Sequence, residues 1–548
     1  MLRQKISEKI RAHAARGGAL RAAEALIRRK EVEISYRRWL LWSRKSSRDY
    51  SKMGKEPMMW EPLIGVRAYM SPGDRTAFME SLNLQVYRTF RADKNCPDAD
   101  YILIVGPGCI LTPDLLWQAV HLLNKEGYTS WTSERSPALF YFDSDRILEG
   151  GRKTDPAFRP GYDPDLLGEV NYMGPVVLVR ADLAKQAGLP EDGKDALHAF
   201  LKRVCALAME QEGGRAQEAI VHIPQVLYHE TAACDSTHDA AAPEAEREAQ
   251  GESGWEDALV SVLIPNKDHV QDLKQCIESL QNVNTWENLE ILIIENNSQD
   301  PETFAYYEEL CRENPRVRVL TYNGAFNYSA VNNYGAANAS GDLLLLLNND
   351  TMILESESIR HMAYLAAKPD TGAVGAMLWY PDGTIQHAGV IFGYGGIAGH
   401  ALAGETDARE LGTYPDLVFS HTHNVSAVTG ACMMIRRGVY LGAGGLDEVL
   451  SVAFNDVDLC MRLRKSGLKI LLCPQAQLCH NESVSRGQED TPQKVERFHQ
   501  EIRDMAARWK DELLEGDPYY NPNLTLTGRT WTCRDELRER SKPCLKYL

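Results

Sequence analysis

Polar side chains follow three apolar runs of this 548-residue chain, and each polar group includes a carboxylate. The groups are Pro-Asn-Lys-Asp at 265–268, Glu-Asn-Asn-Ser at 295–298 and Asn-Asn-Asp at 348–350. One such group is often no more than a turn, because Asn and Asp are common turn residues. Three in succession, each directly after an apolar run, favour a ligand-binding site over three unrelated turns.

The elements that must position these groups are expected to be parallel strands. Short apolar runs at 258–265, 289–297, 317–322 and 342–350 alternate with segments that carry apolar residues at helical spacing. Continuous apolar strands separated by helices are typical of a parallel sheet covered on both faces. Ligands of such sheets bind at the carboxyl ends of the strands. We therefore expect an α/β fold in which the three polar groups lie along one edge of one sheet.

An ordered series of motifs extends over about 230 residues of the rear half. The series reads VSVLIPNKD, ILIIENNSQD, NYGAANASGDLLLLLNNDT, YPDGTIQHAG, VTGACMMIRRGVYLGAGGLDE, AFNDVDLCMRLRKSG and HNESVSRG. With these motifs, residues 259–487 resemble the family 2 glycosyltransferases of GT-A fold, in the branch that assembles bacterial polysaccharides. The resemblance implies inverting transfer of a sugar from a nucleotide-sugar donor, dTDP-rhamnose or a UDP-sugar. The implied acceptor is a hydroxyl of a surface polysaccharide or of a lipid-linked glycan precursor.

The resemblance also implies a divalent metal, Mn²⁺ or Mg²⁺, which carboxylate oxygen holds against the diphosphate of the donor. Asp350 is the expected main metal ligand, and His480 is a second candidate for binding metal or diphosphate. Asn348 and Asn349 replace the commoner acidic pair, and they can hydrogen-bond ribose or phosphate. The other residues expected to bind the donor are Pro265, Lys267, Asp268, Glu295 and Asn297 around the nucleotide, and Arg486 at the diphosphate.

Inverting transfer requires a carboxylate that deprotonates the acceptor hydroxyl as this attacks the anomeric carbon. In the segment AFNDVDLCMRL the base position of the family falls on Asp456, which we expect to be the catalytic base. The same segment reads as a helix start, where Asn455 could be the N-cap while Asp456 points into the cleft. Asp458 is expected to orient this loop or helix start. The two histidines of the segment SHTHNV, at 421 and 423, are interpreted as part of an acceptor-side loop.

The front half of the chain resembles the rear half, which indicates an internal repeat. The parallel segments are 174–189 with 430–446, 222–229 with 472–480 (Pro-Gln and a terminal histidine in both), and 101–116 with the run that starts at 343. We therefore expect a second GT-A-like module at 59–230. In it Gly-Pro-Gly at 106–108 replaces the acidic motif, and at most Asp195 remains of the base segment. The module is also too short before residue 101 to hold the second strand. We expect it to be degenerate and inactive; a second active transferase with an unusual donor site is the alternative.

The remaining segments complete the predicted organisation. Residues 1–58 read as a basic helical region, which suits an anionic membrane surface or packing against the protein's own body. Residues 231–257 read as a solvated linker. Residues 258–487 are the expected catalytic GT-A domain, and residues 488–548 the expected helical C-terminal extension.

The overall composition limits the location and partners of the protein. A net charge of −16 argues against a nucleic-acid partner. The twelve cysteines form no C-x-x-C pair, so we expect neither a zinc site nor a disulfide scaffold. No signal peptide is visible, and no apolar run reaches the ~20 residues of a membrane span. We expect a cytoplasmic protein, either free or at the inner face of the membrane, and a homo-oligomer is compatible with the sequence.

Two other functions compete with sugar transfer. A nucleotidyltransferase also uses carboxylates and a metal, but it needs a Gly-rich basic loop after the first strand, and PNKDHVQD contains no glycine. The alternative of a different class is a non-catalytic glycan-binding or scaffold protein of a polysaccharide-assembly complex. The presence of both Asp350 and Asp456 argues against this alternative.

Overall fold

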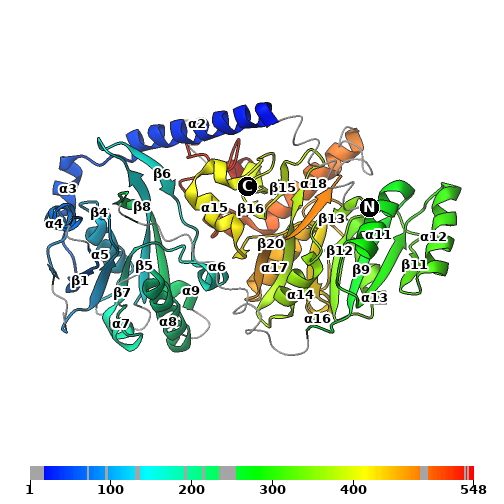
Figure 1. Ribbon diagram of the computed structural model, residues 1–548, viewed down its shortest axis with the longest axis horizontal. Helices are drawn as coiled ribbons and strands as arrows, with labels where there is room; N and C mark the ends of the chain where they lie inside the picture. The colour runs from blue at the N-terminus through cyan, green and yellow to red at the C-terminus, as the bar shows by residue number, and fades with distance from the viewer. Residues whose placement is uncertain are drawn as a thin grey trace.

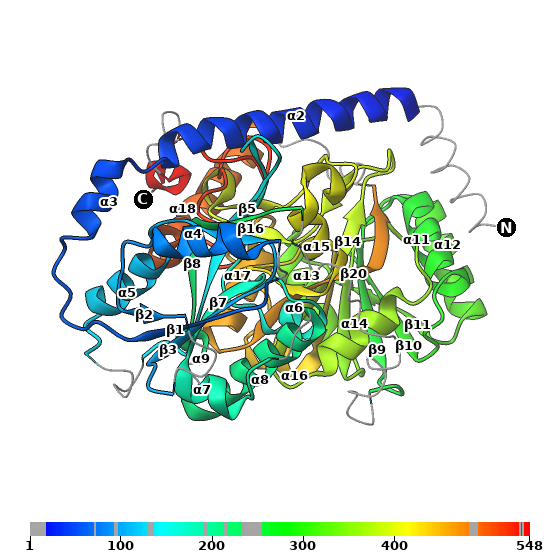
Figure 2. The same cartoon turned by 60° about the vertical axis from the view of Figure 1, so that its left-hand side comes forward.

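The computed structural model consists of two α/β modules side by side, with a long N-terminal helix across both (Figure 1, Figure 2). Here the front module contains the strands between residues 64 and 230, and the rear module those between 260 and 480. The prediction of two α/β modules is confirmed. The structure describes residues 18–70, 73–92, 97–129, 136–190, 194–212, 216–232, 234, 255–481, 491–535, 539 and 542–547.

The rear sheet has the strand order β11-β10-β9-β12-β19-β14-β20-β13. Its first strands are parallel, as the apolar runs predict, whereas β19 is antiparallel to both β12 and β14. The strands are Val260–Asn266 (β9), Leu289–Glu295 (β10), Val317–Thr321 (β11), Leu343–Leu347 (β12), Thr351–Ile353 (β13), Thr371–Trp379 (β14), Cys432–Arg436 (β19) and Lys469–His480 (β20). Short strands beside them are Ile385–His387 (β15) on β14, His423–Asn424 (β18) on β20, and the pair Val390–Phe392 (β16) and Ala398–His400 (β17).

The five leucines of β12 explain why this sheet is covered on both faces. Leu344 and Leu346 pack into one apolar cluster, and the other three leucines of the strand pack into a second. Alternate strand residues point to opposite faces of a sheet. Since all five leucines are at most 2% exposed, both faces of the sheet are covered at β12. The helices of the rear module that pack on this sheet are Val270–Asn282 (α11), Pro301–Glu313 (α12), Tyr328–Asn338 (α13), Ser358–Ala367 (α14), Arg437–Gly442 (α16) and Asn455–Lys465 (α17). The helix Thr413–Ser420 (α15) packs against the front module, and short 3₁₀ helices lie at Tyr394–Gly396 (η2) and Ala408–Leu411 (η3).

The front sheet, ordered β2-β1-β3-β7-β5-β8-β4, repeats the pairing of the rear sheet. The pairs β1·β3 and β5·β8 are parallel and β3·β7 is antiparallel, just as β9·β12, β14·β20 and β12·β19 are. The strands are Ile64–Ala68 (β1), Phe90–Arg91 (β2), Tyr101–Val105 (β3), Cys109–Leu111 (β4), Leu139–Ile147 (β5), Lys153–Ala157 (β6), Val176–Arg180 (β7) and Ile220–Glu230 (β8). The helices are Arg75–Asn83 (α4), Leu115–Lys125 (α5), Pro164–Glu169 (α6), Ala181–Gln186 (α7), Lys194–Glu212 (α8) and Ala216–Ala219 (α9).

The front copy is shortened between its first and central strands. In the rear module the segment 267–342 contains α11, β10, α12, β11 and α13. In the front module the corresponding segment is 69–100, and its described residues form only α4 and the two-residue strand β2. The elements that would complete a nucleotide-binding half are therefore reduced to one short strand in this part of the described chain.

The strand register corrects one detail of the predicted repeat. In the rear module Thr351 pairs with His480, and in the front module Cys109 pairs with Glu230. Glu230 is therefore the counterpart of His480, and His229 lies one residue earlier. A shift by one residue turns a side chain to the other face of the sheet, so the two terminal histidines of the repeat are not equivalent.

The N-terminal helix α2 (Gly18–Ser43) packs one face against the protein's own body. Arg28, which is 1% exposed, donates to Glu405 of the rear module at 2.9 Å. The Tyr36 hydroxyl donates to Asp145 of the front module at 2.5 Å. The helix thus joins the two modules, and a second helix, Ser47–Met53 (α3), follows it. None of the described helices is long and apolar enough to cross a membrane.

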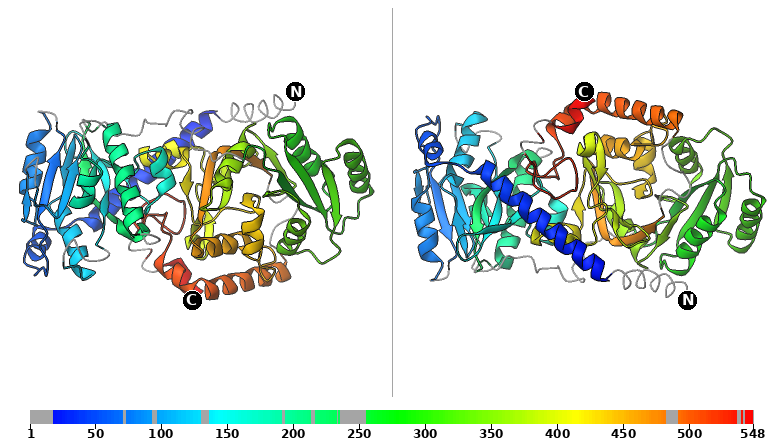
Figure 3. Two further views of the ribbon diagram at one scale, coloured as in Figure 1. Left: turned by 90° about the horizontal axis from the view of Figure 1, so that it is seen from below. Right: turned by 90° about the horizontal axis from the view of Figure 1, so that it is seen from above.

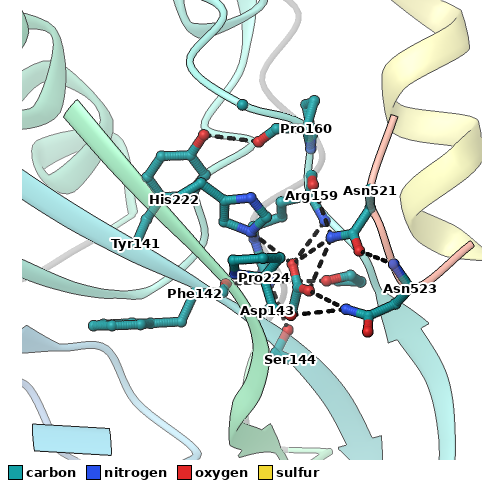
Figure 4. Close-up of polar contacts among 12 residues, drawn as sticks. Tyr141, Phe142, Asp143, Ser144, Arg159, Pro160, His222, Pro224, Asn521 and Asn523 are labelled. Carbon is teal, nitrogen blue, oxygen red and sulfur yellow. Dashed lines mark hydrogen bonds and ion pairs between the residues drawn. The ribbon is translucent and has the colours of Figure 1, made fainter. Parts of the chain in front are cut away.

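The C-terminal extension also contacts both modules. After the helices Pro492–Arg508 (α18) and Lys510–Glu515 (α19), Asp517 accepts a hydrogen bond from Phe392 N of the rear module at 2.6 Å. The Asn521 amide then donates to both carboxylate oxygens of the buried Asp143 in the front module, at 2.9 and 3.1 Å (Figure 4). A 3₁₀ helix, Pro543–Lys546 (η4), lies near the end of the chain. The segment between α19 and η4 also packs against α2, because Arg28 donates to Thr532 Oγ1 at 2.9 Å and Cys533 N donates to Ser35 Oγ at 3.2 Å. Figure 3 shows this segment (dark red) beside α2 (blue), with α18 (orange) further away.

Candidate active site

A cavity of about 430 Å³ lies at the carboxyl ends of β9, β10 and β12. Of the predicted donor ligands, Pro265, Lys267, Asp268, Asn348 and Asn349 line it. The polar groups that follow three strands therefore meet at one sheet edge, as the sequence pattern predicts. The other lining residues are Asn266, His269, Asn296, Phe326, Tyr328, Val331, Val452, Lys494 and Arg497.

Asn349 connects two of the three strand-end loops. Its amide donates to Asn266 Oδ1 at 2.6 Å, and the Asn266 amide in turn donates to the Tyr307 hydroxyl at 2.7 Å. Asn349 is only 6% exposed. Its main contact is therefore with the neighbouring loop, which it holds beside the cavity.

Asp268 connects the first loop to the second. Its Oδ1 accepts hydrogen bonds from Gln299 N at 2.7 Å and Asp300 N at 2.9 Å. Although desolvation opposes it, these backbone donors lower the pKa of Asp268 below its usual value. Asp268 and His269 both have positive φ, at 52° and 50°. The carboxylate therefore shapes the loop that surrounds the cavity, while the neighbouring Lys267 is exposed.

Two predicted nucleotide ligands, Glu295 and Asn297, are not among the described residues that line this cavity. Glu295 is 4% exposed, and its carboxylate accepts from Ser298 N and Oγ, both at 2.6 Å, and from the Tyr307 hydroxyl at 2.8 Å. Asn297 is exposed, and its amide donates to Gly324 O at 2.8 Å. Both residues hold the second loop in shape, and Asn296 between them lines the cavity instead.

The two candidate metal ligands lie together at the ends of β12 and β20. Asp350 Oδ1 is 3.1 Å from His480 Nε2, and the two residues are 6% and 7% exposed. Asn348 contacts the same ring nitrogen, with its Nδ2 at 3.2 Å. The described residues contain no group of three or more His, Cys, Asp or Glu that could hold a metal. Arg486 lies outside the described residues.

Asp456, the expected base, is connected to this site through the chain before β19. Its Oδ2 accepts from Gly430 N at 2.9 Å, and its Oδ1 accepts from Val457 N at 2.8 Å. The Tyr328 hydroxyl donates to Gly430 O at 2.8 Å and lies 3.3 Å from Asn348 Oδ1. Asp456 thus stands on the same edge of the sheet as the candidate metal ligands, with both carboxylate oxygens held by backbone donors.

Asn455 is not the N-cap of α17, and this expectation is wrong. The cap position is Phe454, in a left-handed conformation with φ 62°, and no side chain caps the helix. The Asn455 amide instead contacts the carbonyls of Leu450 and Val452, both at 3.3 Å. Asn455 therefore fixes the preceding loop, because its side chain points back toward that loop and away from the first helical turn.

Asp458 links α17 to the C-terminal extension. The residue is fully buried and accepts hydrogen bonds from Arg508 at 2.7 Å and from Trp509 Nε1 at 3.0 Å. These contacts fix α18, and α18 contributes Lys494 and Arg497 to the cavity lining. The sequence predicted a helical extension, but it gave no sign that this helix supplies cationic residues to the site.

The histidines at 421 and 423 lie at the contact between the modules. Both are buried, and burial lowers the pKa of His423 to about 4. Their neighbour Asn424 donates to Asp163 of the front module, at 2.7 Å from its backbone N and 2.6 Å from its amide. Their surroundings therefore belong to the module interface.

The corresponding edge of the front module has different chemistry. Gly-Pro-Gly at 106–108 follows β3, where Asn-Asn-Asp follows β12. Glu230, the counterpart of His480, accepts from Ser144 Oγ at 2.7 Å and lies 3.7 Å from the guanidinium of Arg159. Arg159 is 1% exposed. A buried side-chain cation therefore faces the residue that replaces His480.

The front module also replaces the contact made by the expected base. Gly174 is the counterpart of Gly430, because each lies two residues before the strand that pairs with the central strand. Gly174 N donates to Asn171 Oδ1 at 3.2 Å, in place of a carboxylate. Asp195, at the start of α8, is exposed. The front edge thus has an amide where the rear edge has Asp456.

Comparison with known proteins assigns the rear module to a family. The model described as glycosyl transferase family 2 matches residues 261–441. The chain is 34% identical over 460 residues to the uncharacterized protein y4gI of Sinorhizobium fredii, covering 78% of this chain and 48% of that protein. It is 34% identical over 464 residues to the O-antigen biosynthesis protein RfbC of Myxococcus xanthus, covering 78% of this chain and 34% of that protein.

A shorter match covers the N-acetylglucosaminyl-diphospho-decaprenol L-rhamnosyltransferase of Mycobacterium tuberculosis. The identity is 30% over 129 residues, which is 22% of this chain and 41% of that protein. The chain thus spans about half the length of the first of these relatives and a third of the second.

Proposed function

Residues 261–441 belong to glycosyl transferase family 2, and on this premise we propose that the protein is an inverting, metal-dependent glycosyltransferase. It moves a sugar from a nucleotide-sugar donor to a hydroxyl of a bacterial surface polysaccharide or of its lipid-linked precursor. The observation that carries this proposal is the joint position of Asp350, His480 and Asp456 on one sheet edge, beside a cavity lined by polar loops. The resemblance to RfbC supports the polysaccharide substrate class.

The residues of the cavity suit a nucleoside diphosphate. Lys267, Lys494 and Arg497 bring positive charge to its lining, and Asn266, Asn296 and Asn348 bring amides. Carboxylate oxygen and imidazole nitrogen are common metal ligands, so Asp350 and His480 fit a divalent ion. Such an ion, when bound, neutralises the diphosphate as it leaves. Two protein ligands are enough where substrate phosphates complete the coordination, as is usual for Mg²⁺.

Asp456 is proposed to take the proton of the acceptor hydroxyl. The acceptor oxygen forms the new bond to the anomeric carbon while the bond to the diphosphate oxygen breaks, and the proton passes to the Asp456 carboxylate. Hydrogen bonds from Gly430 N and Val457 N hold the carboxylate in place before the acceptor arrives. Attack from the face opposite the diphosphate gives inversion.

The front module is proposed to be non-catalytic and to brace the rear module. Its edge has glycines, a buried arginine and an amide in place of the acidic motif and the base. Its contacts with α2, with Asn424 and with the C-terminal extension fix its position. If the front module also binds the acceptor glycan, this binding is a second role beside the bracing of the rear module.

The proposed function is tested with a panel of nucleotide sugars. The panel consists of dTDP-rhamnose, UDP-hexoses and UDP-N-acetylhexosamines, and each is added to purified protein with Mn²⁺ or Mg²⁺. We expect one class of donor either to be hydrolysed slowly or to protect the protein against thermal unfolding. Removal of the metal with EDTA should abolish the response. No response to any donor, together with binding of polysaccharide, would favour the glycan-binding or scaffold alternative.

We also propose that an exposed face of α2, which borders a groove against the C-terminal extension (Thr525, Arg529 and Glu539), binds an anionic membrane surface. Ile27, Ile34 and Leu41 recur every seven residues along this face and are 65%, 50% and 76% exposed. The exposed Lys30 and Arg38 flank the stripe. An apolar stripe with basic flanks is typical of helices that lie in the membrane interface. The helix extends ~39 Å along the outside of both modules (Figure 2).

Membrane binding is tested by co-sedimentation with phosphatidylcholine vesicles that contain phosphatidylglycerol. Each basic residue near an anionic surface contributes ~1 kcal/mol, so K30Q/R38Q should weaken binding about 30-fold. The variant I27S/I34S/L41S should also release the protein. The matched control, R312Q/K465Q, removes two side chains that are each 71% exposed and lie on the rear module. Equal binding of control and K30Q/R38Q would contradict the assignment of this face.

A further inference from the structure

The motif YPDGTIQHAG places β15 beside the candidate metal site, and the proposed function gives this motif no role. Within it, Gln386 is 4% exposed. His480 Nδ1 lies 2.7 Å from Gln386 Oε1, and the Gln386 amide nitrogen makes a longer contact of 3.5 Å with the backbone oxygen of His480. The backbone oxygen of His480 can only accept a hydrogen bond, so the Gln386 amide nitrogen must face it. The Gln386 amide oxygen then faces the His480 ring.

These contacts fix a proton on one ring nitrogen of His480. Gln386 Oε1 is an acceptor, so Nδ1 must donate to it. On the other side of the ring, the Asn348 amide nitrogen is a donor and lies 3.2 Å from Nε2. Gln386 therefore fixes a proton on Nδ1 and turns Nε2 toward Asn348 and Asp350.

Nε2 faces the carboxylate of the other candidate metal ligand. Nε2 lies 3.1 Å from Asp350 Oδ1. Nε2 and Asp350 Oδ1 are two protein atoms close enough to share one divalent cation. This arrangement is therefore prepared for a cation before donor and metal arrive.

The front module lacks this contact, although it keeps the strand. Ser144 and Leu378 are equivalent, because they pair with the equivalent residues Tyr228 and Leu478. Ala157 pairs with Ser144, and His387 pairs with Leu378, so Ala157 and His387 are also equivalent. The residue before each is then Pro156 in the front module and Gln386 in the rear module. The histidine and its glutamine partner are thus both replaced in the copy that lacks Asp350.

We propose that Gln386 is a positioning residue of the metal site, and that it holds His480 in the tautomer that presents Nε2 to the divalent cation. This inference rests on the proposed function, since it assumes that Asp350 and His480 bind the metal of a glycosyl transfer. Partners that orient a metal-binding histidine through its other ring nitrogen typically change metal affinity or activity 10–100-fold when they are removed.

The test compares two variants of nearly equal size in the full-length chain. Q386L removes the acceptor, whereas Q386E keeps an oxygen at the same place. Mn²⁺ affinity is measured by the EPR signal of free Mn²⁺, with and without UDP, and thermal unfolding without metal reports folding. We expect Q386L to weaken Mn²⁺ binding about 10–100-fold with little change in unfolding temperature, and Q386E to stay within about threefold of the wild type.

Three outcomes would overturn the assignment. If Q386L binds Mn²⁺ as the wild type does, Gln386 has no role in the metal site, and the proposed function is unaffected. If both variants lose affinity and unfold at lower temperature, Gln386 serves packing alone. If the wild type fails to bind Mn²⁺ even with UDP, the metal site itself is wrong, and the donor panel then decides separately whether sugar transfer stands.

Discussion

Replacing Asp456 with asparagine is expected to lower the rate of sugar transfer roughly 10²–10⁴-fold, the range that a general base contributes. The amide cannot take the proton of the acceptor hydroxyl, so the chemical step slows while the donor cavity keeps its lining. We therefore expect kcat to fall and the KM for the donor to stay close to that of the wild type. Steady-state kinetics with the donor and acceptor found active, together with UDP binding by calorimetry, measure both quantities.

The internal repeat supplies a matched control for this experiment. D195N makes the same change at the start of α8, the front helix that corresponds to α17. It should leave transfer unchanged, because the front edge contains neither the metal ligands nor the contact to Gly430. Transfer by D456N at the wild-type rate would contradict the base assignment. A loss of activity in D195N would instead revive the alternative of an active front module.

The position of the site was predictable because it depends on where strands end. The apolar run at 343–347 identifies β12, and the polar residues after it must lie at the carboxyl edge of a parallel sheet. Asn348, Asn349, Lys267 and Asp268 lie there for this reason. The same reasoning identified the repeat, since the order of strands in both modules follows the order of similar segments.

The direction of individual side chains could not be predicted in the same way. Glu295 ends β10 and Asn297 lies just after it, as expected, yet their side chains bond to Ser298 and Gly324. Which neighbour in a strand-end loop faces the ligand depends on backbone torsions such as the φ of 61° at Asn297. A sequence pattern determines the edge but not these torsions.

Contributions from distant segments were also beyond the sequence pattern. Lys494 and Arg497 reach the cavity because Asp458 binds Arg508 and Trp509. That contact joins residues about 50 positions apart and has no periodic signature. The predicted repeat was wrong by one residue at its end because it matched the two terminal histidines. The Pro-Gln pairs at 224–225 and 474–475, compared without a gap, make Glu230 equivalent to His480, as the strand pairing does.

Replacing Asp350 with asparagine is expected to abolish the response of the protein to metal. A bound metal ion contributes several kcal/mol of charge stabilisation, so loss of its main protein ligand should lower kcat/KM at least ~100-fold. Mn²⁺ should no longer protect the protein against thermal unfolding in the presence of UDP. The control E355Q removes an exposed carboxylate five residues further along the chain, and it should keep both responses.

The same change should leave the stability of the metal-free protein intact. In the wild type the carboxylate of Asp350 faces His480 Nε2 at 3.1 Å, and Gln386 fixes a proton on Nδ1 of the same ring. The amide of D350N has nearly the same size as the carboxylate and can donate to Nε2, so a hydrogen bond at this position is kept. D350N should therefore unfold close to the temperature of the metal-free wild type, while losing its activity. A variant that instead lost stability and activity together, with metal binding intact, would show that Asp350 acts as a structural residue. A metal ligand can be lost without loss of the fold, whereas a structural carboxylate cannot, so the metal response and the unfolding temperature together distinguish the two roles of Asp350.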